Sequence, residues 1–157
     1  MHSVFKIVLA STVLILGMAA ATAAPDSLVG TWKLNVARST FSPGPAFVSQ
    51  TRNYAETPQG LLLTITTTTV GGKTSTASMT FKYDGKPHVM AGNADFDSVS
   101  VTRVDAFTTS STQLKAGKSV GTGLRTVAKD GKTMTYEQKG THVDGVKYHD
   151  VLFYDRQ

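Results

Sequence analysis

Four basic or aromatic side chains continue the apolar faces of predicted strands, which places them where they could contact a ligand. Arg103 follows Val99 and Val101, Tyr83 follows Met79 and Phe81, Tyr136 follows Met134, and His149 precedes Val151 and Phe153. Residues two apart in a strand point the same way. If these faces turn inward, the four side chains line a mostly apolar cavity with a few polar groups, which is the composition of a ligand pocket. The alternative is that they sit at strand ends and reach water.

Of the four side chains, Arg103 has the greatest need of a partner of opposite charge if it faces the interior. An unpaired charge is costly in an apolar interior, so an inward Arg103 needs an anionic partner. A carboxylate on the ligand and an aspartate of the protein would serve equally. Arg103, Tyr83, Tyr136 and His149 are therefore the candidate ligand-binding residues.

Residues suited to catalysis or metal binding are few. If the protein is an enzyme, His149 and Tyr136 are the candidate acid–base pair. Residues 117–121 spell Gly-x-Ser-x-Gly, but a turn precedes them and a strand follows, whereas a nucleophile elbow joins a strand to a helix. The histidines outside the N-terminal segment lack H-x-H and H-E-x-x-H spacing, so no metal and no cofactor are predicted.

Composition excludes several classes of partner and chemistry. The 157 residues carry 16 Lys and Arg against 11 Asp and Glu, a formal net charge of +5, without a run of five or six basic residues. Nucleic acid is therefore not an expected partner. The absence of cysteine excludes disulfides, thiolate metal sites and cysteine nucleophiles. A disulfide-free domain must rely on packing and backbone hydrogen bonds.

Residues 1–23 have the layout of a cleaved signal peptide. A short segment with Lys6 precedes an apolar run over 7–20, which is too short for a comfortable membrane span, and Ala21-Thr22-Ala23 fits the cleavage pattern. No cysteine follows, so a lipid anchor is not predicted. We expect residues 24–157 to be periplasmic or secreted, with a net charge of +4 once Lys6 is removed and no stable membrane anchor.

Residues 24–157 are predicted to form a single all-β domain. Threonine, a β-branched residue that suits a pleated surface, occurs 21 times between Thr31 and Thr141, and no helical spacing is sustained. Turn signals such as Asp130-Gly131 and Asp144-Gly145 recur between alternating segments. The strand candidates are 29–34, 47–56, 61–70, 73–83, 87–91, 97–104, 106–115, 118–128, 132–139 and 145–155.

Strands of this length joined by tight turns predict an antiparallel up-and-down meander. Such a sheet has free edges unless its first and last strands meet. Closure would give a barrel of about 8–10 strands that is filled by side chains or holds one small ligand. An open two-sheet sandwich is the alternative. Only 35–46, interrupted by Pro43-Gly44-Pro45, lacks alternation, and we expect it to cross one barrel mouth or form a long connection.

The start of the first strand resembles a known family. Gly30-Thr31-Trp32 is similar to the G-x-W opening of lipocalins and related calycin barrels. Most of residues 28–157 resembles small secreted bacterial lipocalin-like domains, through Gly-Thr-Trp-Lys-Leu-Asn, Phe-Ser-Pro-Gly-Pro, the Asp-Gly turns and the closing Tyr-Asp-Arg-Gln. The resemblance implies that Trp32 closes the barrel floor, with Arg156 or Arg125 packed across its ring. The two helices and the Arg-x-Tyr carboxylate clamp of fatty-acid-binding barrels are not expected.

These observations favour one function and leave two alternatives. The resemblance implies an internal cavity that takes a small, largely apolar molecule, and an inward Arg103 would suit a carboxylate on it. The first alternative is an enzyme, a lyase, isomerase or hydrolase, that uses His149 and Tyr136 in the same barrel. The second is a module with a packed interior that binds a protein or an envelope component through its outer surface.

Overall fold

Ten antiparallel strands account for almost all of the regular structure. The computed structural model describes residues 25–44 and 47–157, so the predicted signal peptide lies outside the described residues. The strands are β1 (Gly30–Leu34), β2 (Phe47–Thr57), β3 (Gly60–Thr69), β4 (Thr74–Phe81), β5 (Asp84–Val89), β6 (Ser98–Arg103), β7 (Thr108–Lys115), β8 (Lys118–Val127), β9 (Thr133–Thr141) and β10 (Lys147–Arg156). A single 3-10 turn, η1, spans Val36–Arg38.

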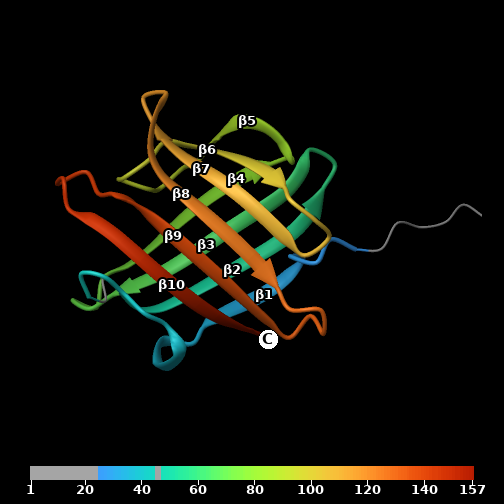
Figure 1. Cartoon of the computed structure of the whole chain (residues 1–157), viewed down its shortest axis with the longest axis horizontal. Helices are drawn as coiled ribbons and strands as arrows, with labels where there is room; N and C mark the ends of the chain where they lie inside the picture. The colour runs from blue at the N-terminus through green and yellow to red at the C-terminus, as the bar shows by residue number, and fades with distance from the viewer. Residues whose placement is uncertain (1–24, 45–46) are drawn as a thin grey trace, which may run out of the picture.

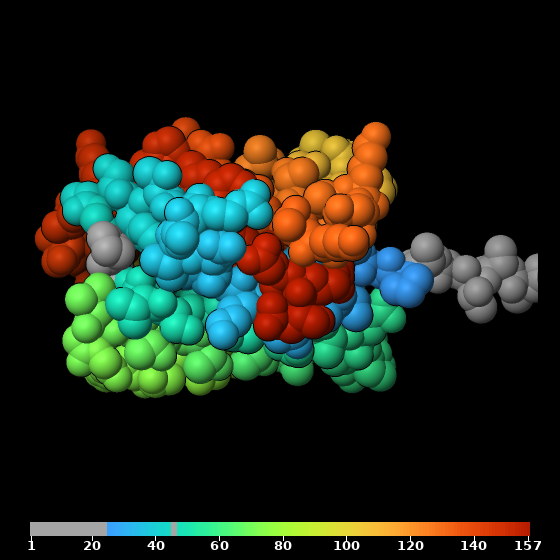
Figure 2. All heavy atoms as spheres, turned by 90° about the horizontal axis from the view of Figure 1, so that it is seen from below, coloured from blue at the N-terminus to red at the C-terminus, as the bar shows by residue number. Residues whose placement is uncertain are grey.

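The strands form one curved sheet in the order β4-β3-β2-β1-β10-β9-β8-β7-β6-β5 (Figure 1). The prediction of an all-β meander barrel is confirmed, and so is the pairing of the first strand with the last, since Trp32 lies opposite Arg156. From below, the N-terminal residues, in blue and cyan, lie between the red C-terminal segment and the green strands (Figure 2).

The two edges of the sheet, β4 and β5, approach each other and nearly close the barrel. Ser78 and Ala91 form an isolated antiparallel bridge there. The Ser78 N–H donates to the Ala91 carbonyl at 3.0 Å, and the Ala91 N–H donates back at 2.9 Å. The seam of the barrel therefore lies in the middle of the chain, while β1 and β10, the first and last described strands, pair within the continuous part of the sheet.

Local turn chemistry explains the meander. Ala116 and Gly117 join β7 to β8 with φ angles of 48° and 75°, as a two-residue hairpin turn requires. Asp84-Gly85 carries the same Asp-Gly signal but does not form a hairpin turn, because both residues belong to β5, where the register against β6 shifts between Asp84 and Pro87. The glycine there supplies a local irregularity in a strand instead of a hairpin turn.

One end of the barrel, the floor, is closed by the segment around Trp32. Trp32 has no exposed surface, and its indole N–H donates to the Leu28 carbonyl at 2.7 Å. The Arg156 guanidinium lies 4.1 Å from the Trp32 ring and donates to the carbonyls of Val29, Ser27 and Gly131. Arg156 therefore occupies the position that the lipocalin resemblance implies, and Arg125 lies elsewhere.

The segment that lacks strand alternation runs along the outside of β10 to the opposite end, the mouth. Thr40 forms a bridge with Val151, and the His149 N–H donates to the Ser42 carbonyl at 2.9 Å. Its described part ends at Gly44, among the residues around the mouth. Within 25–44 and 47–157, no helix has the length and apolar character needed to cross a membrane.

Candidate ligand-binding cavity

A cavity of about 510 Å³ occupies the barrel interior and opens at the mouth. Its volume lies within the range of small-molecule sites. The interior is therefore hollow, in contrast to the packed core that the interaction-module alternative requires. The lining combines aliphatic and aromatic side chains with two arginines, Arg52 and Arg125, and a group of amide and phenol side chains.

Arg52 is on β2 and is 5% exposed. Its Nε donates to the Gln50 side-chain oxygen at 2.9 Å and to the Tyr154 hydroxyl at 3.0 Å. The guanidinium carbon lies 4.7 Å from the Tyr136 ring centroid. Burial by itself disfavours the charge, but the phenolic oxygens of Tyr154, Tyr54 and Tyr136 outweigh it and raise the pKa of Arg52 above its usual value. Arg52 is therefore a cation inside the barrel.

Arg125 is on β8 and is also 5% exposed. One of its terminal nitrogens donates to the Thr109 hydroxyl at 3.2 Å, while its Nε has no partner among the described residues. The guanidinium carbon lies 4.5 Å from the Tyr136 ring centroid, so Tyr136 contacts both arginines. None of the ion pairs within the described chain involves Arg52 or Arg125.

Glycines on β8 and β9 make room for the tyrosine rings of the lining. A side-chain carbon at Gly123 would lie 2.5 Å from the Tyr136 ring, and one at Gly140 would lie 2.7 Å from the Tyr148 hydroxyl. The Tyr148 hydroxyl donates to the Gln113 side-chain oxygen at 2.8 Å, and the Gln113 side-chain nitrogen donates to the Tyr136 hydroxyl at 3.3 Å. Gln113 thus fixes both phenols.

A loop between β5 and β6 crosses part of the mouth and is fastened to the β9–β10 turn. An Asp95 oxygen lies 2.9 Å from His142 Nδ1, and the other Asp95 oxygen accepts from the Val143 N–H at 2.9 Å. The His142 ring packs at 4.5 Å against Tyr148. Asp95, His142 and Tyr148 all line the cavity, so this contact borders the path by which a ligand would enter.

Two of the four candidate ligand-binding residues lie at the floor, outside the cavity. Arg103 and Tyr83 both bind the Asp26 carboxylate, and the Tyr83 hydroxyl donates to it at 2.8 Å. The Arg103 guanidinium lies 4.1 Å from the Tyr83 ring. The prediction that they line the cavity is wrong because both occur at strand ends, where a protein aspartate supplies the anionic partner.

The other two candidates lie on opposite sides of the barrel wall. Tyr136 faces inward and lines the cavity, whereas His149 is exposed and lies 2.9 Å from a Glu137 carboxylate oxygen on the outer surface. The expected inward face of β10 is therefore wrong, because Leu152 and Tyr154 point inward instead of Val151 and Phe153. The wall also separates the acid–base pair His149 and Tyr136.

The two arginines that face the cavity, Arg52 and Arg125, are not among the predicted ligand-binding residues. On β8 the apolar Leu124 is 45% exposed, whereas Arg125, which the resemblance offered as a partner of the Trp32 ring, is buried and lines the cavity. The expectation that no Arg-x-Tyr spacing occurs is also wrong, since Arg52 and Tyr54 have that spacing and both are buried on β2. The signal that could have found Arg52 is its position between Gln50 and Tyr54.

Comparison with known proteins adds information about the fold. No family model and no curated protein match the chain. Among solved structures, a zebrafish ileal bile acid-binding protein in complex with cholic acid is similar, with a TM-score of 0.50 over 83% of this chain and 99% of that one, at 9% sequence identity. This chain therefore shares its barrel fold with that bile acid-binding protein.

Proposed function

We propose that this protein binds a small amphipathic anion inside its barrel and does so outside the cytoplasm. The observation that carries the proposal is the pair Arg52 and Arg125, which are buried in the cavity lining and have only neutral hydrogen-bond partners among the described residues. Phenolic oxygens already stabilise the Arg52 charge, but Arg125 has only the Thr109 hydroxyl as a hydrogen-bond partner, and removing an ion from water costs several kcal/mol unless an opposite charge compensates. An anionic ligand would supply that charge.

The rest of the cavity indicates the remainder of the ligand. Aliphatic and aromatic side chains such as Leu63, Met79 and Val101 line the space beyond the arginines. Each Å² of apolar ligand surface buried against them contributes about 25 cal/mol to binding. The ligand is thus a molecule with one anionic group and a substantial apolar surface. The bile acid-binding neighbour, solved with cholic acid, supports this reading.

Calorimetric titration with a matched anion and alcohol tests the proposal. We expect dodecanoate to bind at least tenfold more tightly than dodecanol, because the two share a chain and only the first carries a charge for the arginines. Equal binding of the two, or no binding of dodecanoate, would overturn the proposal. Native mass spectrometry of protein isolated from its own source should also reveal a co-purifying acid.

The location is tested separately. A protein exported and processed at the predicted site begins at Ala24, so the intact mass of the extracytoplasmic form should equal that of residues 24–157. Recovery of the full-length chain from the cytoplasmic fraction alone would contradict export without affecting the binding proposal.

A further inference from the structure

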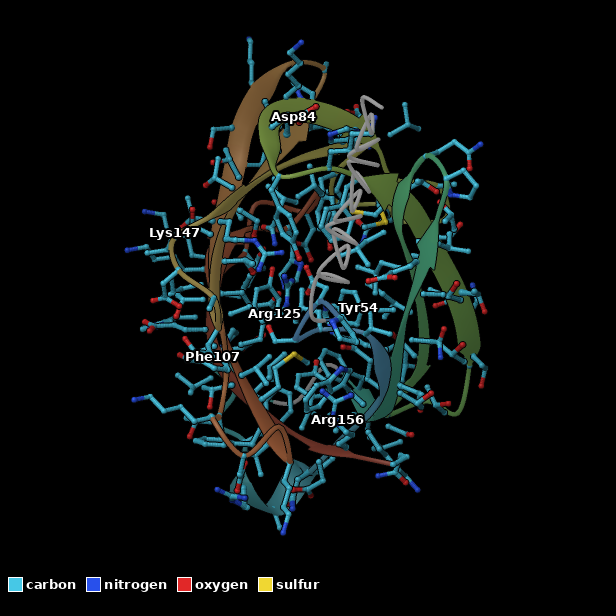
Figure 3. The ribbon with its side chains drawn as sticks, turned by 90° about the vertical axis from the view of Figure 1, so that its right-hand side faces the viewer. Tyr54, Asp84, Phe107, Arg125, Lys147 and Arg156 are labelled. Carbon is cyan, nitrogen blue, oxygen red and sulfur yellow. The ribbon has the colours of Figure 1, made fainter. Side chains whose placement is uncertain are left out.

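The lining of the cavity is divided into two arcs of opposite character. The polar arc comprises inward side chains of β7, β8, β9, β10 and, beyond β1, β2: Ser111, Gln113, Arg125, Tyr136, Gln138, Tyr148, Asp150, Gln50 and Arg52. The apolar arc comprises the deep positions of β3, β4 and β6 on both sides of the seam: Leu63, Ile65, Ala77, Met79, Phe81, Val99 and Val101. Figure 3 shows Arg125 and Tyr54 in the interior between the walls, with Phe107 and Lys147 on the outside.

The polar arc extends well beyond the two arginines. Gln113 and Tyr148 lie on it toward the mouth, and Gln138 donates to an Asp150 carboxylate oxygen at 3.1 Å. A carboxylate group bound by Arg52 and Arg125 would occupy only one part of this surface. The rest presents amide, phenol and carboxylate groups to the ligand along several strands.

Two tyrosines of the polar arc lie close against glycines of the sheet. At Gly123 and Gly140 the absence of a side chain lets the Tyr136 and Tyr148 rings approach the sheet more closely than any other residue would permit. At the deep positions a broad polar surface therefore faces an apolar one across the cavity, although the same strands β3 and β4 also contribute Thr67, Thr69 and Ser75 to the lining. A ligand hydroxyl can form hydrogen bonds with the side chains of the polar arc. A hydroxyl that faces the apolar arc would lose its hydrogen bonds to water and gain no replacement partner.

We propose that the cavity selects a rigid, facially amphipathic anion, a molecule whose hydroxyl groups lie on one face and whose other face is hydrocarbon. This inference rests on the proposed function and specifies its ligand class. The anionic group binds at Arg52 and Arg125, the hydroxylated face contacts the polar arc, and the hydrocarbon face contacts the apolar arc. A single flexible hydrocarbon chain has no groups for the polar arc beyond the arginines.

Three probes on the unmodified protein test the proposal, each titrated calorimetrically below its micellar concentration. They are cholate, whose hydroxyls share one face, 5β-cholanate, which has the same rings and carboxylate but no hydroxyls, and hexadecanoate. We expect cholate to bind about tenfold more tightly than either of the others, the equivalent of one additional hydrogen bond. Equal or tighter binding of cholanate or hexadecanoate would overturn this inference and leave the proposed function intact. Failure of all three to bind would overturn both.

Substitutions on opposite arcs test the orientation. Gln113→Leu should reduce the preference for cholate over cholanate about tenfold, whereas Thr112→Val, the outward neighbour on β7, should leave it unchanged. Val101→Thr, a small change that is independent of the Gln113 network, should weaken both steroid anions to a similar extent. An increased preference for cholate in Val101→Thr, or an unchanged preference in folded Gln113→Leu, would overturn the assignment of the two faces.

Discussion

Replacing Arg125 with methionine separates a ligand-binding role from a structural one. Arg125 forms one side-chain hydrogen bond, to Thr109, and its ring contacts are with Tyr136 and Tyr54. The hydrogen bond contributes about 1.5 kcal/mol and the ring contacts up to about 2 kcal/mol. Against this stands the cost of burying an uncompensated cation, several kcal/mol. Methionine has no charge and fills similar space.

We therefore expect Arg125→Met to raise the free energy of unfolding of the ligand-free protein by about 1 kcal/mol, or roughly 4 °C in Tm. The same change should weaken dodecanoate binding by about 3 kcal/mol, or roughly 150-fold in Kd, since it removes one member of a buried charge pair. Urea unfolding and calorimetric titration measure the two effects. A variant that is more stable than the parent protein but binds dodecanoate more weakly is the result that identifies Arg125 as a ligand-binding residue.

The matched control is Lys118→Met, which removes the same charge from an exposed position on the same strand. It should change stability and affinity by a few tenths of a kcal/mol at most. If Arg125→Met is less stable than the parent protein and binds dodecanoate with the same affinity, Arg125 stabilises the fold and does not bind the ligand. The reasoning about an uncompensated cation would then be wrong.

Three further changes test other parts of the structure. Gly123→Ala should lower the free energy of unfolding by about 2 kcal/mol, because the added carbon collides with the Tyr136 ring; an unchanged Tm would contradict the close approach. Arg156→Met should cost about 3 kcal/mol through three lost carbonyl contacts at the floor and should shift Trp32 fluorescence to longer wavelength; an unshifted spectrum would show that the floor closes without Arg156. Burial raises the pKa of the Tyr154 phenol, as it does for Tyr83 and Tyr148, so the fold keeps these protons above pH 10 while the unfolded chain releases them. Stability therefore falls as the pH rises from there, by up to about 1.4 kcal/mol per unit for each such phenol. Tyr154→Phe should reduce that slope, which urea unfolding between pH 9.5 and 11 measures, and an equally steep decline in the variant would refute the assignment.

Turn chemistry and alternation predicted the strands well from the sequence. The candidate ranges 61–70 and 118–128 correspond to β3 and β8 within one residue at each end. The inward face of β4 was also predicted, because Met79 and Phe81 are its large apolar residues and both are buried, as is Ala77 on the same face. Where apolar residues occupy one face only, the period of two identifies the core.

The faces of β8 and β10 could not be predicted in this way. Val151 and Phe153 look like core residues because the outer side of β10 is covered by the segment around Arg38 and Thr40. On β8, glycines leave the inward face with little hydrophobicity, while Leu124 lies outside. A barrel that is polar inside inverts the usual pattern, and the departures from the rule occur where a ligand is expected to bind.

The position of the seam has a consequence for engineering the chain. Residues 26 and 157 lie near β1 and β10, which pair with each other, whereas across residues 25–44 and 47–157 the sheet ends at β4 and β5, which are consecutive in the sequence. A circular permutant that joins the old ends and opens at Lys82 would begin with β5 and finish with β4. Every hydrogen-bonded neighbour in the sheet would then follow its partner directly along the chain. Such a low contact order should speed folding relative to the natural connectivity, while the interior stays the same.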